Sequence, residues 1–419
     1  MSRWLWGGIT LGLVGCRQAA QTPLEDACSA EYQLDNVGGE DQRTIGTMLP
    51  DETGAFGVHV RLAWPEQATS ERWPMALEVQ GAWEQKMGTD ARLQVAAGVV
   101  EVRVDLPGGG LSTGDNDRRG AASRATLATV LRWMAGELRD QGGCTAPERT
   151  GHGDPDDLYL IGTSNGGNLA VAALADPALD LPPIAGLITW ETPVSPPFVN
   201  VEYGADPTVY VPGSCALAPD LRCPFPREQF LDLHKDAPLD VLCFDLNADR
   251  ACDKGIDVVV VGAEDPETDL QMLSPALTAE AEALGAELAG FAGSEAATAW
   301  WAVRDASAQA GALVAAWPDL PVVLLGSDED HVQSASDHPQ IYGWGEALQA
   351  SGAAWTRLNP GTRWLSIAGG ENPPNAVLSL GGTTLRLLTE EEEVQLEDVL
   401  AASVLELSER TRTGDWTTP

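Results

Sequence analysis

The feature that most constrains the fold is a regular alternation of strand-like and helix-like segments along most of the chain. Apolar residues alternate or run together in short segments typical of strands at 57–65, 75–81, 99–106, 157–162, 184–190, 321–326 and 364–368. Helix-like segments lie at 121–139, 166–175, 275–315, 339–350 and 389–410. Alternating β and α units predict an α/β fold with a mostly parallel central sheet and helices on both faces.

One long segment interrupts this alternation. Residues 193–255 are rich in Pro, Asp and Cys and lack helical periodicity, and Ala-rich helical segments follow up to residue 315. We therefore expect residues 194–315 to form an insertion, disulfide-rich and then helical. The α/β core is expected to comprise residues 46–193 and 316–419, so the insertion precedes the last two core strands.

The N-terminus has the features of an export signal. One arginine precedes the apolar run 4–15, which is shorter than the ~20 residues that a membrane-spanning helix needs. The run ends in Leu13-Val14-Gly15-Cys16, which resembles the lipidation box of bacterial lipoproteins. This resemblance implies a signal peptide over residues 1–16 and a lipid on Cys16. Residues 17–45 would be a tether to the membrane of the bacterial cell envelope, with the protein facing the periplasm or the exterior.

Composition limits the partners of the chain. The formal net charge is -37, and a surface this acidic repels phosphate groups, so we expect no nucleic-acid partner. Hydrophobic residues make up 44% of the chain, which is enough for a large core and excludes wholesale disorder.

Six of the seven cysteines lie beyond the predicted signal peptide, and export would allow them to form disulfides. Short loops favour the pairs Cys215–Cys223 and Cys243–Cys252, which leaves Cys28–Cys144 as the third pair. Zinc binding is the competing interpretation. However, no C-x-x-C pair occurs, and His234 has no companion at ligand spacing.

The strongest catalytic motif is Gly162-Thr163-Ser164-Asn165-Gly166, which follows one strand-like segment and precedes the small-residue segment 166–175. Glycines at both ends of this motif let the strand and helix approach each other around a sharp turn that projects the Ser164 hydroxyl. The N-terminus of the helix favours negative charge that develops there. Ser164 is therefore a candidate nucleophile, and the competing interpretation is a serine that only caps the helix.

In this context the chain resembles the α/β-hydrolase superfamily over residues 46–192 and 316–370. The resemblance implies an oxyanion hole formed by the backbone N–H groups of Ala82 and Asn165. Members of the superfamily often have His-Gly where this chain has Gln80-Gly81.

The same resemblance implies a catalytic acid in the loop 326–332, where we favour Asp330 and keep Asp328 and Glu329 as alternatives. Glu191 is a second candidate, because it ends the strand-like segment after the elbow helix. Catalytic groups gather at the carboxyl ends of such strands.

The catalytic base is the least regular part of the pattern. The superfamily places a histidine after the last strand, here after Ala368, yet no histidine follows His338. A serine needs a base to act as a nucleophile near neutral pH. We therefore predict His338 as a displaced base, with His331 as the alternative, and the remaining possibility is that no histidine serves.

A different threading of the chain onto the superfamily pattern restores the usual order of serine, acid and base. It makes 257–262 the acid strand with Asp265 as the acid, and 321–326 the last strand with His331 as the base. This threading assigns the strand-like segment 364–368 to no strand of the superfamily pattern.

The insertion contains a candidate calcium loop. Oxygen-bearing side chains stand at alternating positions in the segment Asp245-Leu246-Asn247-Ala248-Asp249, and Asp253 follows. This resembles the opening of an EF-hand loop, although Arg250 stands where a glycine is wanted and Ile256 where a bidentate glutamate belongs. The alternative is an acidic turn tied by the disulfide Cys243–Cys252.

Two classes of function follow. The first is an exported, lipid-anchored serine hydrolase that cleaves an ester or peptide bond of a small-molecule, lipid or peptide substrate, with no required cofactor and the insertion as a lid. The second is a catalytically dead surface binding module on the same scaffold, with the insertion as its working part.

Overall fold

The computed structural model describes residues 28, 42–51, 53–66, 72–81, 85–87, 93, 95–192, 233–236, 241–245, 248–253, 258–260, 263–273, 275–283, 289–326, 339–358, 377–380, 383–386 and 396–416. Among these residues, no helix combines the length and the apolar character needed to cross a membrane.

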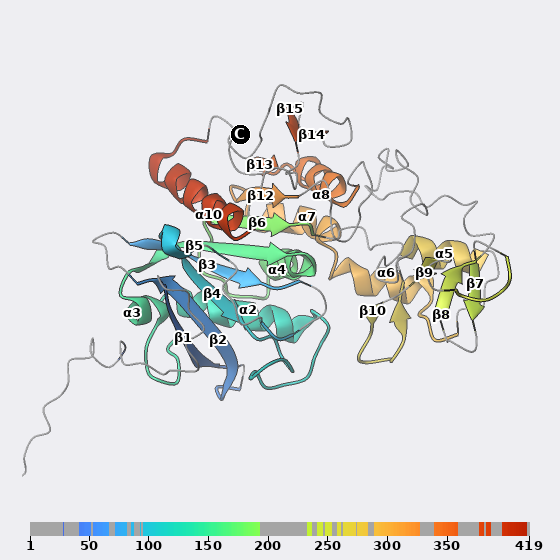
Figure 1. The fold of residues 1–419 in the computed structure, drawn as a ribbon, viewed down its shortest axis with the longest axis horizontal. Coiled ribbons are helices and arrows are strands. Elements are labelled where there is room, and N and C mark those ends of the chain that lie inside the picture. The colour runs from blue at the N-terminus through green and yellow to red at the C-terminus, as the bar shows by residue number, and fades with distance from the viewer. Residues whose placement is uncertain are drawn as a thin grey trace, which may run out of the picture.

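An eight-stranded sheet forms the centre of the molecule (Figure 1). Its strands are, in chain order, β1 (Gln42–Pro50), β2 (Phe56–Pro65), β3 (Trp73–Val79), β4 (Val100–Val104), β5 (Gly153–Thr163), β6 (Gly186–Trp190), β12 (Pro321–Leu325) and β13 (Trp355–Leu358). Their order across the sheet is β1-β2-β4-β3-β5-β6-β12-β13. Strand β2 runs antiparallel to both of its neighbours, and the strands from β4 to β13 are parallel. The predicted mostly parallel sheet is confirmed.

Two strands at the edges of the sheet differ from the expectation. Strand β1 begins at Gln42, inside the segment predicted to be the tether, and it pairs with β2. Among the described residues the sheet ends at β13, which pairs with β12 and was not predicted as a strand. The predicted strand 364–368 lies outside the described residues. Both edge strands bury fewer side chains than the central strands, so their apolar pattern is weak.

Helices cover both faces of the sheet, as predicted. One face packs against α2 (Ala121–Met134), α4 (Asn165–Ala175), α7 (Ala306–Ala316) and α8 (Pro339–Ala350). The other face packs against the short η1 (Val95–Ala97) and the C-terminal α10 (Leu396–Thr413), and Figure 1 shows α10 alone at the upper left. Helix α7 belongs to the core rather than to the insertion, because Ala306, Ala310 and Leu313 are buried in the main apolar cluster.

The described residues of the predicted insertion that precede α7 lie beyond the arrowheads of β3, β5 and β6 in Figure 1. It contains a three-stranded antiparallel sheet, the pair β10 (Ala263–Glu264) and β11 (Gln271–Met272), and helices α5 (Pro275–Ala283) and α6 (Ser294–Ala302). The three strands of that sheet are β7 (Leu233–Asp236), β8 (Val241–Phe244) and β9 (Val258–Val260). Because β9 lies outside the central sheet, the alternative threading that made 257–262 a core strand is wrong. A separate hairpin consists of β14 (Val377–Leu380) and β15 (Thr383–Arg386).

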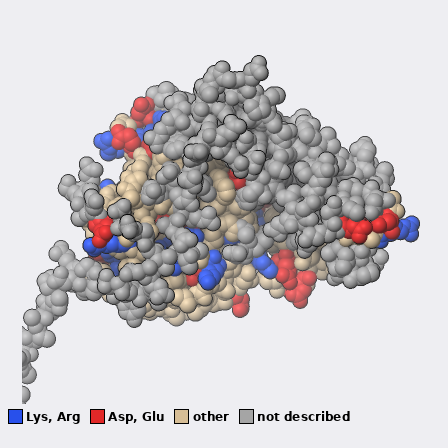
Figure 2. All heavy atoms as spheres, viewed as in Figure 1, with Lys and Arg blue, Asp and Glu red and all other residues tan. Residues whose placement is uncertain are grey.

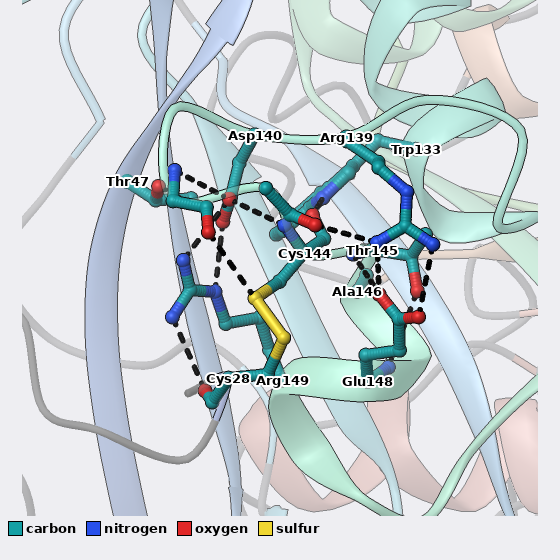
Figure 3. Close-up of polar contacts among 12 residues, drawn as sticks. Cys28, Thr47, Trp133, Arg139, Asp140, Cys144, Thr145, Ala146, Glu148 and Arg149 are labelled. Carbon is teal, nitrogen blue, oxygen red and sulfur yellow. Dashed lines mark hydrogen bonds and ion pairs between the residues drawn. A yellow bond between two sulfur atoms is a disulfide. The ribbon is translucent and has the colours of Figure 1, made fainter. Parts of the chain in front are cut away.

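A disulfide and a buried ion pair hold Cys28, which precedes β1 in the chain (Figure 3). Cys28 is bonded to Cys144, as predicted, just before the short helix α3 (Ala146–Thr150). Arg149 of α3 donates two hydrogen bonds to Asp140, at 2.8 and 3.0 Å, and one to the carbonyl oxygen of Cys28 at 3.1 Å. Since α3 directly precedes β5, this attachment lies at the amino ends of the parallel strands.

Charged side chains lie in small groups at the surface. Figure 2 shows acidic and basic side chains close to one another on the described part of one face. One such pair joins Arg118 to Glu264 of the insertion, with 2.8 Å between Nη2 and Oε2. Exposed pairs of this kind contribute about 0–1 kcal/mol each, so the apolar core carries the stability of the fold.

Candidate active site

Ser164 stands at a strained turn between β5 and α4. Its φ is 50° and its ψ is -127°, a backbone conformation that residues other than glycine rarely adopt. The side chain is 7% exposed, and the backbone N–H donates to the carbonyl of Trp190 at 2.7 Å. The neighbouring strand therefore holds the turn in place, and the sharp turn predicted for the motif is confirmed.

Two glycines make this turn possible. A Cβ on Gly162 would lie 2.3 Å from the Cα of Gly167, and one on Gly166 would lie 2.0 Å from the carbonyl oxygen of Val79. No rotation of a side chain could relieve these contacts, because each is with backbone. The close approach of β5, α4 and the end of β3 therefore requires glycine at both positions.

Gly81, which directly precedes the predicted oxyanion-hole donor Ala82, lies against Ser164. A Cβ on Gly81, which follows the end of β3, would lie 2.7 Å from the Cβ of Ser164. Asn165 is the first residue of α4, so its N–H belongs to the first turn of an 11-residue helix, where backbone N–H groups favour an anion. Ala82, the other predicted donor, lies outside the described residues.

The strand order and the position of the turn together decide the fold. In the described central sheet, β5 ends in the strained serine turn and β3 ends beside it. Strand β2 is antiparallel to β4, and the strands from β4 to β13 across this sheet are parallel. The chain has the α/β-hydrolase fold. Open α/β sheets bind their ligands at the carboxyl ends of the strands, and Ser164 and Gly81 lie at this edge.

No protein-family model and no curated protein matches the chain. Among solved structures, brefeldin A esterase, a bacterial homologue of human hormone-sensitive lipase, is 13% identical with a TM-score of 0.40, covering 93% of this chain and 81% of that chain. A structure of esterase Est22 is 12% identical with a TM-score of 0.42, covering 76% and 71%. A prolyl endopeptidase is 12% identical with a TM-score of 0.40, and the alignment covers 77% of this chain but only 35% of the endopeptidase.

Glu191 is the candidate acid that the structure describes. It directly follows β6, is 1% exposed and has a φ of 43°. Its backbone N–H donates to the carbonyl of Leu325, the last residue of β12, at 2.9 Å. Glu191 is thus a buried acidic residue on a strained backbone, one strand away from the turn at Ser164, and strained positions of this kind cluster at functional sites.

The acids predicted in the loop 326–332 and both predicted bases lie outside the described residues. Asp328, Glu329, Asp330, His331 and His338 all belong to the segment between β12 and α8. That segment begins beside Glu191, because Leu325 of β12 is in register with Trp190 of β6. The loop that contains the predicted acids and bases therefore begins at the same edge of the sheet as Ser164.

His59 is a described histidine that is bonded to a buried aspartate. His59 of β2 bonds through Nδ1 to Asp105 at 2.7 Å, and both side chains are buried. Asp105 also accepts hydrogen bonds from the backbone of Met87 at 2.7 Å and of Leu111 at 2.9 Å. Burial alone would raise the pKa of Asp105, but the hydrogen bonds from His59, Leu111 and Met87 outweigh it and lower the pKa. This pair fastens two loops at the carboxyl edge of the sheet.

Sequence reasoning missed a buried charged group beneath the site. Glu78 is 0% exposed, and it accepts hydrogen bonds from Arg103 at 2.9 Å and from the Thr163 hydroxyl at 3.0 Å. Arg119 is also buried and donates to the carbonyls of Gln80 and Gly81. The sequence contains a signal for this group, because Glu78 is a charged residue in an otherwise apolar strand. A charged side chain that is buried in such a strand needs a partner of opposite charge or a hydrogen bond.

The candidate calcium loop forms a turn in the described residues. The disulfide Cys243–Cys252 forms as predicted. Asp245 accepts hydrogen bonds from the backbone of Asp249 at 3.2 Å and of Arg250 at 2.7 Å. Asn247 and the predicted disulfide Cys215–Cys223 lie outside the described residues, and the described ones contain no group of three or more acidic, His or Cys side chains suited to a metal.

Asp265, the acid of the alternative threading, also has a structural role. It accepts a hydrogen bond from the Thr268 hydroxyl at 2.7 Å in the turn between β10 and β11. This turn belongs to the insertion, so the position of Asp265 agrees with the rejection of that threading.

Proposed function

We propose that the protein is a serine hydrolase that cleaves an ester or peptide bond by acyl transfer from Ser164. The strained turn at Ser164 carries this proposal, because such a backbone persists only where the surrounding structure imposes it, and it presents a hydroxyl at the edge where this fold performs catalysis. The N–H of Asn165 and that of the peptide after Gly81 would bind the oxyanion of the tetrahedral intermediate.

In this proposal, a histidine of the β12–α8 segment takes the proton of Ser164 and later protonates the leaving group. His338 is our first choice and His331 the alternative. Glu191 or Asp330 orients the imidazole and stabilises its charged form. The buried position of Glu191 supports it as the acid.

The direct test is turnover of p-nitrophenyl butyrate and of short peptide p-nitroanilides. We expect turnover by the wild type, a loss of about 10⁴-fold or more in kcat for Ser164→Ala, and a loss of at least about 100-fold for His338→Ala. If His331→Ala and not His338→Ala abolishes turnover, the base is His331. Equal turnover by wild type and Ser164→Ala would refute the proposal.

A surface binding module without catalysis is the second candidate. It is favoured by the absence of any histidine after His338, where the superfamily places its base. An inactive wild type whose Ser164 resists activated phosphonates would support this function instead.

We further propose that the protein is anchored in the bacterial cell envelope through a lipid on Cys16. The lipidation box and the Cys28–Cys144 disulfide support this, since disulfides persist in oxidising compartments. Cys16→Ser should release the protein from membranes or block its processing. A variant that still fractionates with membranes and carries as much lipid would contradict the anchor.

A further inference from the structure

A buried arginine binds the backbone beside the candidate nucleophile. Arg119 is 2% exposed, and its Nη2 donates to the carbonyl oxygen of Gln80 at 2.9 Å and to that of Gly81 at 3.0 Å. Gly81 lies so close to Ser164 that a Cβ on it would overlap the serine side chain. The guanidinium of Arg119 therefore holds the segment that lies against Ser164.

Nearby carboxylates stabilise this cation. Burial lowers the pKa of Arg119 to about 10, and the charges of Glu78 and Asp117 act in the opposite direction. The side chain therefore stays protonated near neutral pH. A buried charge is costly unless it is paired, so the two carboxylates make this position tolerable.

Glu78 connects the same group of charges to the nucleophile turn. Its Oε1 accepts a hydrogen bond from the hydroxyl of Thr163, the residue directly before Ser164, at 3.0 Å. Its Oε2 accepts one from Nε of Arg103 at 2.9 Å. One carboxylate thus binds the nucleophile turn, while the guanidinium that it attracts binds the end of β3.

The turn that carries Arg119 is itself fixed from two sides. Asp117 accepts a hydrogen bond from the backbone of Ser123 in α2 at 3.0 Å. Arg304, which follows α6 of the insertion, donates to the carbonyl of Arg118 at 3.0 Å. Arg118 and Arg119 have φ values of 50° and 67°, so the surrounding contacts impose an uncommon backbone on this turn.

We propose that Arg119 is a positioning residue of the oxyanion hole, which fixes the peptide group after Gly81 against Ser164. The oxyanion donor that the resemblance predicts belongs to the peptide whose carbonyl Arg119 holds, so Arg119 can act on that donor through the Gly81 carbonyl. A cation on the carbonyl also polarises the peptide and strengthens its N–H as a donor. The inference rests on the proposed hydrolase function and adds a residue that the catalytic motifs do not contain.

The test compares Arg119→Met with the wild type on p-nitrophenyl butyrate. We expect kcat to fall by about 100-fold, close to the loss of one oxyanion donor, with KM changed by less than about threefold. Affinity for a trifluoromethyl ketone, whose adduct carries the oxyanion, should fall in parallel with kcat/KM. The kcat of Arg119→Lys should lie between those of the wild type and Arg119→Met, because the lysine ammonium keeps the charge but lacks the planar fork of donors.

Arg149→Met is the matched control. Arg149 is another buried arginine that donates to a carbonyl and pairs with an aspartate, but it lies at the amino ends of the strands. Its loss should lower stability while kcat per folded molecule stays at the wild-type value.

The outcomes separate the two proposals. A folded Arg119→Met variant with wild-type kcat and ketone affinity overturns the role of Arg119 while the hydrolase stands. If that variant does not fold, Arg119→Gln takes its place, and a wild-type kcat for the Gln variant overturns the role equally. A wild type with no turnover and no reaction with the ketone removes the hydrolase function, and this inference with it.

Discussion

Replacing Ser164 with glycine should abolish activity and leave the protein more stable than replacing it with alanine. The serine is held at a φ of 50° and a ψ of -127°, and residues other than glycine pay about 1–3 kcal/mol for such a backbone. Glycine removes this strain but loses about 0.5–1 kcal/mol more backbone entropy on folding. Ser164→Gly should therefore be up to about 2.5 kcal/mol more stable than Ser164→Ala, which lacks the same hydroxyl but keeps the strain.

The comparison is best made by urea denaturation at one pH, with thermal unfolding as a second measurement. A difference of about 1 kcal/mol corresponds to about 2–4 °C in Tm for a domain of about 150–250 residues. The matched control is Ala312→Gly in α7, an exposed helical position where glycine should be less stable than alanine by about 1 kcal/mol. The reasoning fails if glycine is less stable than alanine at position 164 by the same free energy of unfolding as at position 312. That result would mean that the turn at Ser164 is not strained.

Three further predictions concern stability. Gly166→Ala should destabilise the protein by about 1–3 kcal/mol or more in urea denaturation, because the new Cβ would meet the carbonyl of Val79 at 2.0 Å, and an unchanged midpoint would contradict this packing. Asp105 has a lowered pKa in the folded state. Its contribution to stability is therefore fully present above its pKa in the unfolded chain, about 3.9, and is lost as the pH falls through its pKa in the folded protein. Asp105→Asn should therefore destabilise the protein at pH 7 and much less near pH 3, and a loss that is equal at both pH values would count against the hydrogen-bonded carboxylate. Cys28→Ser should lower stability by about 2–5 kcal/mol, the usual range for a native disulfide, and an unchanged unfolding midpoint would show that the disulfide does not secure the N-terminal segment.

The central strands and the nucleophile turn could be predicted because their signals are local. Strands β3 and β5 are buried on both faces, so each gives a nearly continuous apolar run in the sequence. The glycines beside Ser164 mark a turn whose geometry permits no larger residue. The same local logic predicted Cys243–Cys252, since a short loop brings its two cysteines together.

Contacts between distant segments could not be predicted. In β13, Arg357 is 1% exposed and is paired with Glu406 of α10, so a strand with a charged residue at a buried position looked like a loop. Strand β1 is an edge strand whose face is partly exposed, and its sequence therefore resembles a tether. The group formed by Glu78 and Arg119 joins three separate parts of the chain, which no spacing rule connects.

The most direct test of the central claim is to treat the folded protein with a fluorophosphonate and map the adduct by tandem mass spectrometry. An activated serine attacks the phosphorus and displaces fluoride, whereas an ordinary buried hydroxyl does not react. We predict one adduct per chain, located on Ser164, with none on Ser164→Ala. A wild-type chain that stays unlabelled, or that is labelled elsewhere and equally in Ser164→Ala, would contradict the account of this site as a serine hydrolase.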